Sequence, residues 1–442
     1  MDTGDTAWVL ASASLVLLMT PGLALFYGGM VRAKSVLNMM MMSFGAMALI
    51  GVLWVLYGFS VAFGNDVGGG LLGNPGEFFG LKGLLGESHL VGTLPAMAFV
   101  GFQSAFAIIA VALISGAIAD RAKFGAWMVF AGVWATIVYF PVAHWVFSFD
   151  GVVSEVGGWI AKAGAIDFAG GTAIHINAGA AGLALALVLG KRRGFGRDPM
   201  RPHNLPLVML GAGILWFGWF GFNAGSATAA NGTAAVAWIN TLAATSAAIL
   251  GWLLTEKVRD GHATSLGGAS GAVAGLVAIT PACSALNPMT SIVVGVLAGV
   301  FCALAVGLKY KFGYDDSLDV VGVHLVGGLW GTLSIGFFAT ADAPAGVDGL
   351  FYGGGFGQLW IQFYAAVAVM VFSFLVTLLI GFVIQKTMGF RIEEEDEVAG
   401  IDQVEHAESA YDWGTLGGGS GRTAGSPLGQ ARHASGTSEV SA

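Results

Sequence analysis

The chain has 442 residues, of which 56% are hydrophobic and only 10% are charged, against roughly 25% charged residues in an average soluble protein. A soluble domain of this length must cover its surface with charged side chains, so the composition excludes that class. The mean hydropathy of +0.76 and the 70 glycines indicate a helical membrane protein, because small residues let membrane helices pack closely. The apolar runs are too long for the strands of a membrane β-barrel, which need about 10 residues each.

The net charge of -8 is concentrated in the tail of the chain. Residues 389–442 hold 10 acidic and 3 basic residues, and the preceding residues hold the other 17 acidic and 16 basic residues. The body is therefore almost neutral and has no basic patch suited to nucleic acid. Cys283 and Cys302 are too few for a disulfide framework or a four-cysteine metal site, and we interpret them as small packing residues.

The apolar runs predict eleven transmembrane helices, because each is long enough to cross about 30 Å of hydrocarbon at 1.5 Å per residue. The eighth run is short and rich in glycine. In chain order the predicted spans are 6–30, 38–63, 94–118, 125–147, 170–190, 204–225, 233–254, 265–282, 290–309, 319–339 and 357–387.

Lysine and arginine residues predict the orientation of these spans. They follow the first, third, fifth, seventh and ninth spans, and only Lys82 and Lys162 of the 19 basic residues fall in loops on the other side. Because cytoplasmic loops carry the excess of basic residues, we expect the N-terminus outside the cell and the C-terminus inside. The protein is expected in the plasma (inner) membrane as a multi-pass protein.

The composition divides the chain into three parts. Residues 1–388 form the predicted transmembrane domain. Residues 389–413 mix acidic side chains with isoleucine, valine and tyrosine, and we expect a short ordered cytoplasmic segment there. Residues 414–442 are rich in glycine, serine, alanine and threonine, a composition typical of disorder.

Two segments repeat one pattern. In residues 167–182 and 316–331 an aspartate, Asp167 or Asp316, lies eight residues before a histidine, and glycines follow that histidine at the fourth and seventh positions. The histidines are His175 in the fifth predicted span and His324 in the tenth. Since five spans separate the copies, they run in opposite directions across the membrane. This arrangement predicts a five-plus-five inverted repeat with a site where the two halves meet.

A histidine inside a membrane is costly and faces a cavity or a partner. The glycines share a helix face with each histidine and allow His175 and His324 to meet, where one imidazole can donate a hydrogen bond to the other. The pair alternatively serves only helix packing, or ligates haem. A zinc site lacks mid-span carboxylate or cysteine partners. The remaining interpretation is a path for a proton or a small protonatable solute, with no cofactor.

Aromatic side chains gather at the predicted outer ends of three spans. Phe102 and Phe106 lie four residues apart in the third span, Trp145 and Phe147 end the fourth, and Trp219, Phe222 and Ser226 end the sixth. They form either an interfacial aromatic belt or a cation–π site for a small ammonium-like ion. Asp167 lies just outside the fifth span, where it supports such a cation, caps the helix, or does both.

Several strings resemble the ammonium transporter family, which includes the Amt, Mep and Rhesus proteins. They are GLALFYGGMVRAKSVLNMM, DFAGGTAIHINAGAAGL, RPHNLP, GWFGFNAGSA and DDSLDVVGVH, and the resemblance runs from about residue 6 to residue 413. It implies eleven helices, a homotrimer with one pore per subunit, and the following residue roles. Phe102, Ser226 and a residue of the fourth span form the outer ammonium site with support from Asp167. Phe106 and Phe222 form the gate, and His175, His324, Trp219 and Thr280 line the pore.

One position departs from the family pattern. The family has a tryptophan at the end of the fourth span where this chain has Phe147, and Trp145 lies two residues away. Those two positions do not share a helix face. Because phenylalanine attracts a cation less strongly than tryptophan, we expect a weaker outer site with intact conduction.

The tail also matches the family at Gly389, Arg391, Gly400, Asp402 and Tyr411. The resemblance implies docking of a trimeric PII signalling protein at the cytoplasmic face; a solvated acidic tail is the alternative.

The sequence thus predicts a non-enzymatic ammonium transporter that captures the ammonium ion outside, removes its proton and conducts ammonia, with the histidines relaying the proton. A partner-coupled ammonium sensor and a passive channel for ammonia or carbon dioxide are the alternatives.

Overall fold

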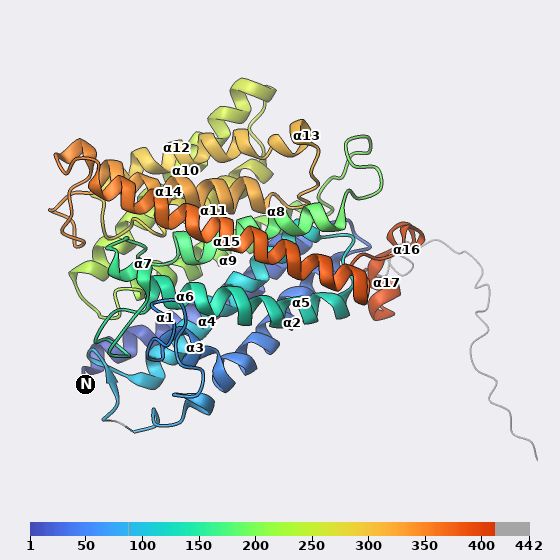
Figure 1. The fold of residues 1–442 in the computed structure, drawn as a ribbon. Helices are drawn as coiled ribbons and strands as arrows, with labels where there is room; N and C mark the ends of the chain where they lie inside the picture. Colours follow the sequence, from blue (N-terminus) through green and yellow to red (C-terminus); the bar gives the residue numbers. More distant parts are fainter. Residues whose placement is uncertain (87, 412–442) are drawn as a thin grey trace, which may run out of the picture. The chain divides into compact units, whose positions relative to one another are not determined.

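The computed structural model describes residues 1–86 and 88–411, and within residues 1–410 the long helices run alongside one another (Figure 1). Ten of the described helices are long and apolar enough to cross a membrane. Their bounds lie within six residues of ten predicted spans: Thr3–Met30, Val36–Phe63, Ala96–Ile118, Phe124–Phe147, Gly171–Leu189, Leu205–Gly225, Gly232–Asp260, Pro288–Phe312, Val321–Phe338 and Gly357–Thr387.

The eighth predicted span, 265–282, is a shorter apolar helix, α11 (Ser265–Ile279). Four of the long spans are single helices: α1 (Thr3–Met30), α9 (Leu205–Gly225), α10 (Gly232–Asp260) and α15 (Gly357–Thr387). The span Pro288–Phe312 comprises α12 (Pro288–Ala305) and α13 (Leu308–Phe312).

Five spans change their helical pitch. The segment Val36–Phe63 comprises α2 (Val36–Leu53), the π-helical turn η1 (Trp54–Gly58) and α3 (Phe59–Phe63). The next two spans consist of α4 (Ala96–Ile114) with the 3₁₀ turn η3 (Ser115–Ile118), and α5 (Phe124–Trp134), η4 (Ala135–Tyr139) and α6 (Phe140–Phe147). The last two begin with π-helical turns: η5 (Gly171–Ile176) before α8 (Asn177–Leu189), and η6 (Val321–Leu325) before α14 (Val326–Phe338).

Short elements occupy the connections. A two-stranded hairpin pairs β1 (Leu90–Val91) with β2 (Leu94–Pro95), and the short helix α7 (Trp159–Lys162) precedes the fifth span. Two 3₁₀ turns, η2 (Phe79–Leu81) and η7 (Leu350–Tyr352), lie in loops. The tail adds α16 (Glu394–Ala399) and α17 (Ile401–His406).

Side-chain caps explain where several spans begin. Asn204, Asn231, Thr264 and Asn287 each stand just before a helix and accept a hydrogen bond from a backbone N–H three residues later. Such caps satisfy N–H groups that have no partner within the helix. The polar residue before each apolar run therefore fixes the start of α9, α10, α11 and α12.

Small residues let the helix backbones approach closely, as the composition predicts. A β-carbon at Gly211 of α9 would lie 2.3 Å from the backbone nitrogen of Phe26 in α1. A β-carbon at Gly295 of α12 would lie 2.2 Å from the carbonyl oxygen of Ala244 in α10. Both separations are shorter than van der Waals contact, so only glycine allows these two pairs of helices to pack this way.

The loops that carry most basic residues lie at the same end of the bundle as α16 and α17, on the right in Figure 1, and we call this the tail end. The end that holds residue 1 is the amino end. Residues 389–410 of the predicted ordered segment lie at the tail end, whereas residues 412 and 413 and the predicted disordered part, 414–442, lie outside the described residues.

Two carboxylates of the tail cap spans of the body. Asp402 accepts hydrogen bonds from the backbone N–H groups of Leu37 (3.0 Å) and Asn38 (2.8 Å) at the start of α2. Glu405 accepts one from the N–H of Phe124 (2.9 Å) at the start of α5. Negative charge at a helix N-terminus is stabilising, so the acidic tail binds the helix ends that the body leaves uncapped.

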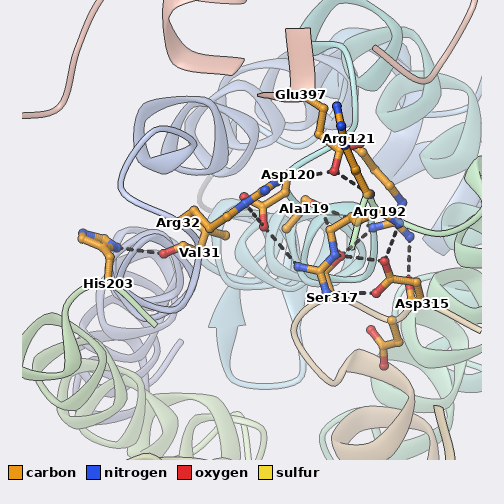
Figure 2. Close-up of polar contacts among 12 residues, drawn as sticks. Val31, Arg32, Ala119, Asp120, Arg121, Arg192, His203, Asp315, Ser317 and Glu397 are labelled. Atoms are coloured by element: carbon orange, nitrogen blue, oxygen red, sulfur yellow. Dashed lines mark hydrogen bonds and ion pairs between the residues drawn. The ribbon is translucent and has the colours of Figure 1, made fainter. Parts of the chain in front are cut away.

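Figure 2 shows the charged network beneath this contact. The buried Arg192 lies between two carboxylates, with ion pairs of 2.9 Å to Asp315 and 3.1 Å to Asp120. Arg32 connects Asp120 (3.4 Å) to Glu397 of the tail (3.5 Å). A chain of ion pairs thereby connects the buried Asp315 to the tail through Arg192, Asp120 and Arg32.

Candidate functional site

A cavity of about 500 Å³ opens at the amino end and receives several of the predicted outer-site residues. We call it the amino-end cavity. Its walls include Phe147 from α6, Ser226 at the end of α9, Asp167 just before η5 and Phe106 from α4. The hydroxyl of Ser226 donates to the carbonyl oxygen of Phe222 (2.8 Å), which leaves the oxygen lone pairs of Ser226 free to accept from a ligand.

Phe102 lies behind this wall. Its side chain is fully buried and its ring centroid is 4.8 Å from that of Phe106. A β-carbon at Gly225 would lie 2.9 Å from the Phe102 ring, so the glycine next to Ser226 makes room for the phenyl group. The structure brings Phe102, Phe106 and Ser226 together, although only Phe106 and Ser226 line the cavity itself.

Phe147 and Trp145 point to different places, as their spacing predicts. Phe147 lines the amino-end cavity. The indole N–H of Trp145 donates to the carbonyl oxygen of Leu71 (2.7 Å), and its ring packs against Trp159 and Phe372. Trp145 therefore holds the loop that contains Leu71, and Phe147 is the aromatic side chain that the fourth span presents to the cavity.

Asp167 organises the start of the fifth span. Its two carboxylate oxygens accept hydrogen bonds from four consecutive backbone N–H groups, those of residues 170–173, at 2.6–3.0 Å. Burial raises the pKa of the Asp167 carboxyl, and these four donors oppose that increase. Gly170, with φ of +122°, provides the turn that aims the donors at one side chain. The helix-capping role expected for Asp167 is thus present, in a residue that also lines the cavity.

Two stacked phenyl rings close the floor of the amino-end cavity. The centroids of Phe106 and Phe222 are 4.2 Å apart and the rings are inclined by only 12°. Phe106 faces the cavity, whereas Phe222 lines the next cavity along the bundle. A solute that passes from one cavity to the other must displace this pair of rings.

The histidine cavity lies directly behind the stacked rings and has a volume of about 10 Å³. His175, His324, Trp219 and Phe222 line it together with aliphatic side chains from α1, α4, α9 and α11. The Nδ1 atoms of the two histidines are 3.2 Å apart. Both side chains are buried, and Nε2 of His175 has no hydrogen-bond partner among the described residues.

Trp219 and Thr280 support this arrangement. The indole ring of Trp219 stacks on His175 at 5.4 Å and 18°, and its N–H donates to the hydroxyl of Thr280 (2.8 Å). Thr280 in turn donates to the carbonyl oxygen of Leu276. Thr280 is thus a buried support for the indole, and it does not line the amino-end cavity or the histidine cavity.

The two glycines predicted to bring the histidines together lie at the crossing of the two segments. A β-carbon at Gly179 would lie 2.5 Å from the backbone nitrogen of Leu325, the residue after His324. A β-carbon at Gly328 would lie 3.1 Å from the β-carbon of His175. The glycine four residues after each histidine therefore packs against the other histidine's segment.

A third cavity, of about 10 Å³, continues from His324 to the tail end. Tyr27, Ser270, Asp319 and His324 line it with aliphatic and aromatic side chains. We call it the tail-end cavity. Tyr27, Ser270 and Asp319 were not among the predicted site residues. The only sequence signal for Asp319 was its position in the second copy of the repeat.

The chain is similar to known proteins over almost its whole length. A model of the Ammonium Transporter Family matches residues 7–411. An ammonium transporter of Mycobacterium tuberculosis is 63% identical over 439 residues, which cover 94% of this chain and 92% of that protein. An ammonium transporter of Bacillus subtilis is 47% identical over 416 residues, covering 93% of this chain and 99% of that protein.

The fold is also similar to solved structures of the same kind of protein. Mep2 of Saccharomyces cerevisiae has a TM-score of 0.81 with 35% identity, covering 89% of this chain and 91% of that chain. A structure described as a sensor Amt protein has a TM-score of 0.83 with 27% identity, covering 91% of this chain and 98% of that chain.

Proposed function

Because the chain belongs to the ammonium transporter family, we propose that it captures the ammonium ion in the amino-end cavity and conducts ammonia past the histidine pair. One observation carries this proposal. An aromatic and hydroxyl-lined cavity leads, through one stacked pair of phenyl rings, to two buried histidines that share a hydrogen bond.

Capture uses the aromatic rings and the serine oxygen. Phe147 supplies a ring face that attracts a cation, and Ser226 accepts a hydrogen bond from one of the N–H groups of ammonium. Phe102 packs against Phe106 from behind the cavity wall and supports this site. Asp167 contributes its negative charge through space, although its oxygens are already used by four backbone donors. Its main contribution is to fix the turn that carries His175.

Deprotonation explains selectivity. An ammonium ion in the apolar histidine cavity would lose hydration worth several kcal/mol or more, whereas neutral ammonia avoids most of that cost. The ion therefore gives up its proton at the Phe106–Phe222 gate, and the histidine pair directly behind the gate accepts it. The potassium ion is similar in size and has no proton to lose, so this path excludes it.

The histidine pair relays the proton. Two N–H groups cannot donate to each other, so one Nδ1 of the pair donates and the other accepts across the 3.2 Å that separate them. Nε2 of His175 lies in the same cavity without a described partner. Passage of ammonia and of the proton along one path makes transport electrogenic.

The topology that accompanies this function has eleven spans, with α11 as the eighth. The basic loops at the tail end support a cytoplasmic location for that end, and the amino end then faces outward in the plasma membrane. The repeated capping aspartate, π-helical turn and histidine support the five-plus-five inverted repeat. The family resemblance supports a homotrimer.

The tail is the proposed docking surface for a trimeric PII signalling protein. Glu397 forms ion pairs with Arg32 and Arg391, and Asp402 caps α2. The Glu397–Arg32 ion pair and the Asp402 cap connect the tail to the segment between α1 and α2 and to the start of α2, whereas the Glu397–Arg391 pair stabilises the tail itself. A partner that displaces the tail would uncap α2, which supports a regulatory role for this segment.

A partner-coupled ammonium sensor is the second candidate, and its support is the similarity to the sensor Amt structure. A passive channel for ammonia or carbon dioxide is less well supported, because a neutral gas needs no aromatic cation site.

The test is charge movement in proteoliposomes after an ammonium pulse, with a matched potassium pulse as the control. Current for ammonium alone is expected. Equal currents for both ions, or ammonia equilibration without current, would contradict the proposal. A sensor with no transport would give neither current nor accelerated ammonia equilibration.

A further inference from the structure

A fixed ammonium group of the protein itself lies beside the tail-end cavity, where it pairs with a carboxylate of the cavity wall. Lys309 of α13 is buried, and its Nζ donates to the carboxylate of Asp319 (2.8 Å) and to the carbonyl oxygen of Asp316 (3.0 Å). Asp319 lines the tail-end cavity with His324. A lysine ammonium group is a substituted ammonium ion, so Lys309 occupies the one carboxylate among the residues that line this cavity with His324.

The backbone holds Asp319 in this position. Its φ is +63°, a conformation that is strained for a residue other than glycine and persists where its surroundings fix it. The preceding loop is fixed by two buried guanidinium groups. Arg121 donates to the carbonyl oxygen of Asp315 and to the hydroxyl of Ser317, and Arg192 pairs with the Asp315 carboxylate (Figure 2).

Negative charge is crowded at this mouth. Asp316 is buried and uses its carboxylate to accept from the N–H groups of Val320 (3.1 Å) and Val321 (2.7 Å) at the start of η6. Burial first, and then the charge of Asp319, raise the pKa of Asp316 to about 6. Lys309 is the cation that offsets the Asp319 charge at close range.

The Asp319 carboxylate is within reach of ions from the tail side, because its side chain is 27% exposed. An unpaired carboxylate at the mouth of a narrow path would concentrate cations there, and ammonium or potassium would be held where release must occur. The amino-end cavity uses a different design, since the oxygens of Asp167 are occupied by backbone N–H groups.

We propose that Lys309 determines the specificity of the exit: its fixed ammonium group pairs with Asp319 and so keeps this carboxylate from binding ammonium or potassium at the tail-end mouth. The role in release rests on the proposed transport function. Lys309 acts through Asp319 and is a positioning residue, because it lines none of the three cavities that form the path.

The test measures the ammonium current in proteoliposomes whose tail end faces the lumen, with increasing potassium in the lumen. Lys309→Met is expected to lower the half-inhibiting potassium concentration about tenfold, because a free carboxylate near low-dielectric walls binds a cation more strongly than in water. Lys309→Arg keeps the charge and is expected to retain the wild-type value. Lys311→Met is the matched control, since Lys311 is exposed and lies two residues away.

The double variant Lys309→Met/Asp319→Asn separates this role from a structural one. It removes the carboxylate together with its partner, so potassium sensitivity is expected to return to the wild-type value. A Lys309→Met protein that conducts with wild-type potassium sensitivity would overturn the proposal. So would a double variant that remains as sensitive as Lys309→Met.

Asp319→Asn covers the case in which Lys309→Met does not fold. This variant leaves the Lys309 cation unpaired at the mouth and is expected to lower the maximal ammonium current severalfold by repulsion. The double variant is expected to restore it. Equal currents in Asp319→Asn and the double variant would contradict the pairing role.

A binding measurement keeps this proposal separate from the transport function. Crystals soaked in thallium(I), which has a size and charge close to those of potassium, are expected to show anomalous density at Asp319 in Lys309→Met and none there in the wild type. Absence of thallium from the variant would overturn the proposal even if ammonium transport is established. A wild-type protein without ammonium current would contradict the proposed function, and thallium would still decide the role of Lys309.

Discussion

The two histidine segments share a local design and open onto very different ends of the bundle. Each begins with an aspartate that caps a π-helical turn, and each turn carries one histidine of the pair. The first segment faces a cavity of about 500 Å³ with aromatic and hydroxyl walls. The second faces a cavity of about 10 Å³ beside a lysine–aspartate pair.

The contrast between the two cavities shows which features belong to the repeat and which belong to one end of the bundle. The repeat supplies two buried imidazoles at hydrogen-bond distance. The ends differ in what they present to a cation: the amino-end cavity has ring faces and a serine oxygen, and the tail-end cavity has a carboxylate that is already paired with Lys309. In our proposal the first end captures the ammonium ion and the second does not hold it.

The largest effect is expected at the shared core. His175→Ala removes the relay, so selective ammonium current is expected to disappear or to give way to an unselective path. His324→Ala should behave in the same way, because the hydrogen bond needs both rings. Currents for ammonium and potassium in proteoliposomes measure this effect. Unchanged current and selectivity in His175→Ala would refute the relay.

The capping aspartates differ in how many backbone groups they satisfy. Asp167→Ala leaves four buried N–H groups without their acceptor, whereas Asp316→Ala leaves two. Each unsatisfied group costs about 1–3 kcal/mol, so Asp167→Ala is expected to lower thermal stability in detergent more than Asp316→Ala. Equal melting temperatures for the two variants would show that the two aspartates contribute equally to stability and would contradict this prediction.

The crossing glycines give a smaller, graded test. Gly179→Ala places a methyl group 2.5 Å from the backbone nitrogen of Leu325, and the nearest contact for Gly328→Ala is 3.1 Å. Overpacking of this kind costs about 1–3 kcal/mol. We expect Gly179→Ala to lower the free energy of unfolding by an amount in that range and Gly328→Ala to lower it less. Thermal unfolding in detergent measures both effects. The reverse order would mean that the second segment is the more tightly packed.

The smallest effect is expected at the amino-end mouth. Phe147→Trp should lower the half-saturating ammonium concentration two- to fivefold, because a better ring face adds about 0.5–1 kcal/mol of cation–π attraction. Trp145→Phe is the matched control: Trp145 contacts Leu71 outside the cavity, so this value should stay unchanged. An unaltered half-saturating concentration in Phe147→Trp would remove Phe147 from the capture site.

Hydropathy located the spans well because membrane helices must satisfy their own backbone groups and face lipid, which is a local requirement. For α11, a 15-residue helix, hydropathy does not decide whether the segment crosses the membrane, because it is shorter than the roughly 20 residues that a spanning helix needs. The Asp–His repeat identified the core from the sequence because both copies keep the same spacing.

The contacts that complete each end depend on residues distant in the chain. Asp402 caps α2 from more than 360 positions away, and nothing near either residue signals this contact. In the sequence, Lys309 is one of the basic residues that close the ninth predicted span, and nothing in its neighbourhood indicates an ion pair. In the structure Asp319, with its positive φ, places its carboxylate next to Lys309. The different directions of Trp145 and Phe147 followed from helix periodicity alone.

The most direct test of the central claim is the charge carried per translocated nitrogen. Current and uptake of labelled methylammonium or ammonium are measured together in the same proteoliposomes at fixed voltage. Our account predicts one net positive charge per nitrogen, since ammonia and its proton cross together. Nitrogen uptake that exceeds uptake by empty liposomes and carries no charge would contradict it, and the histidine pair would then have no part in moving protons.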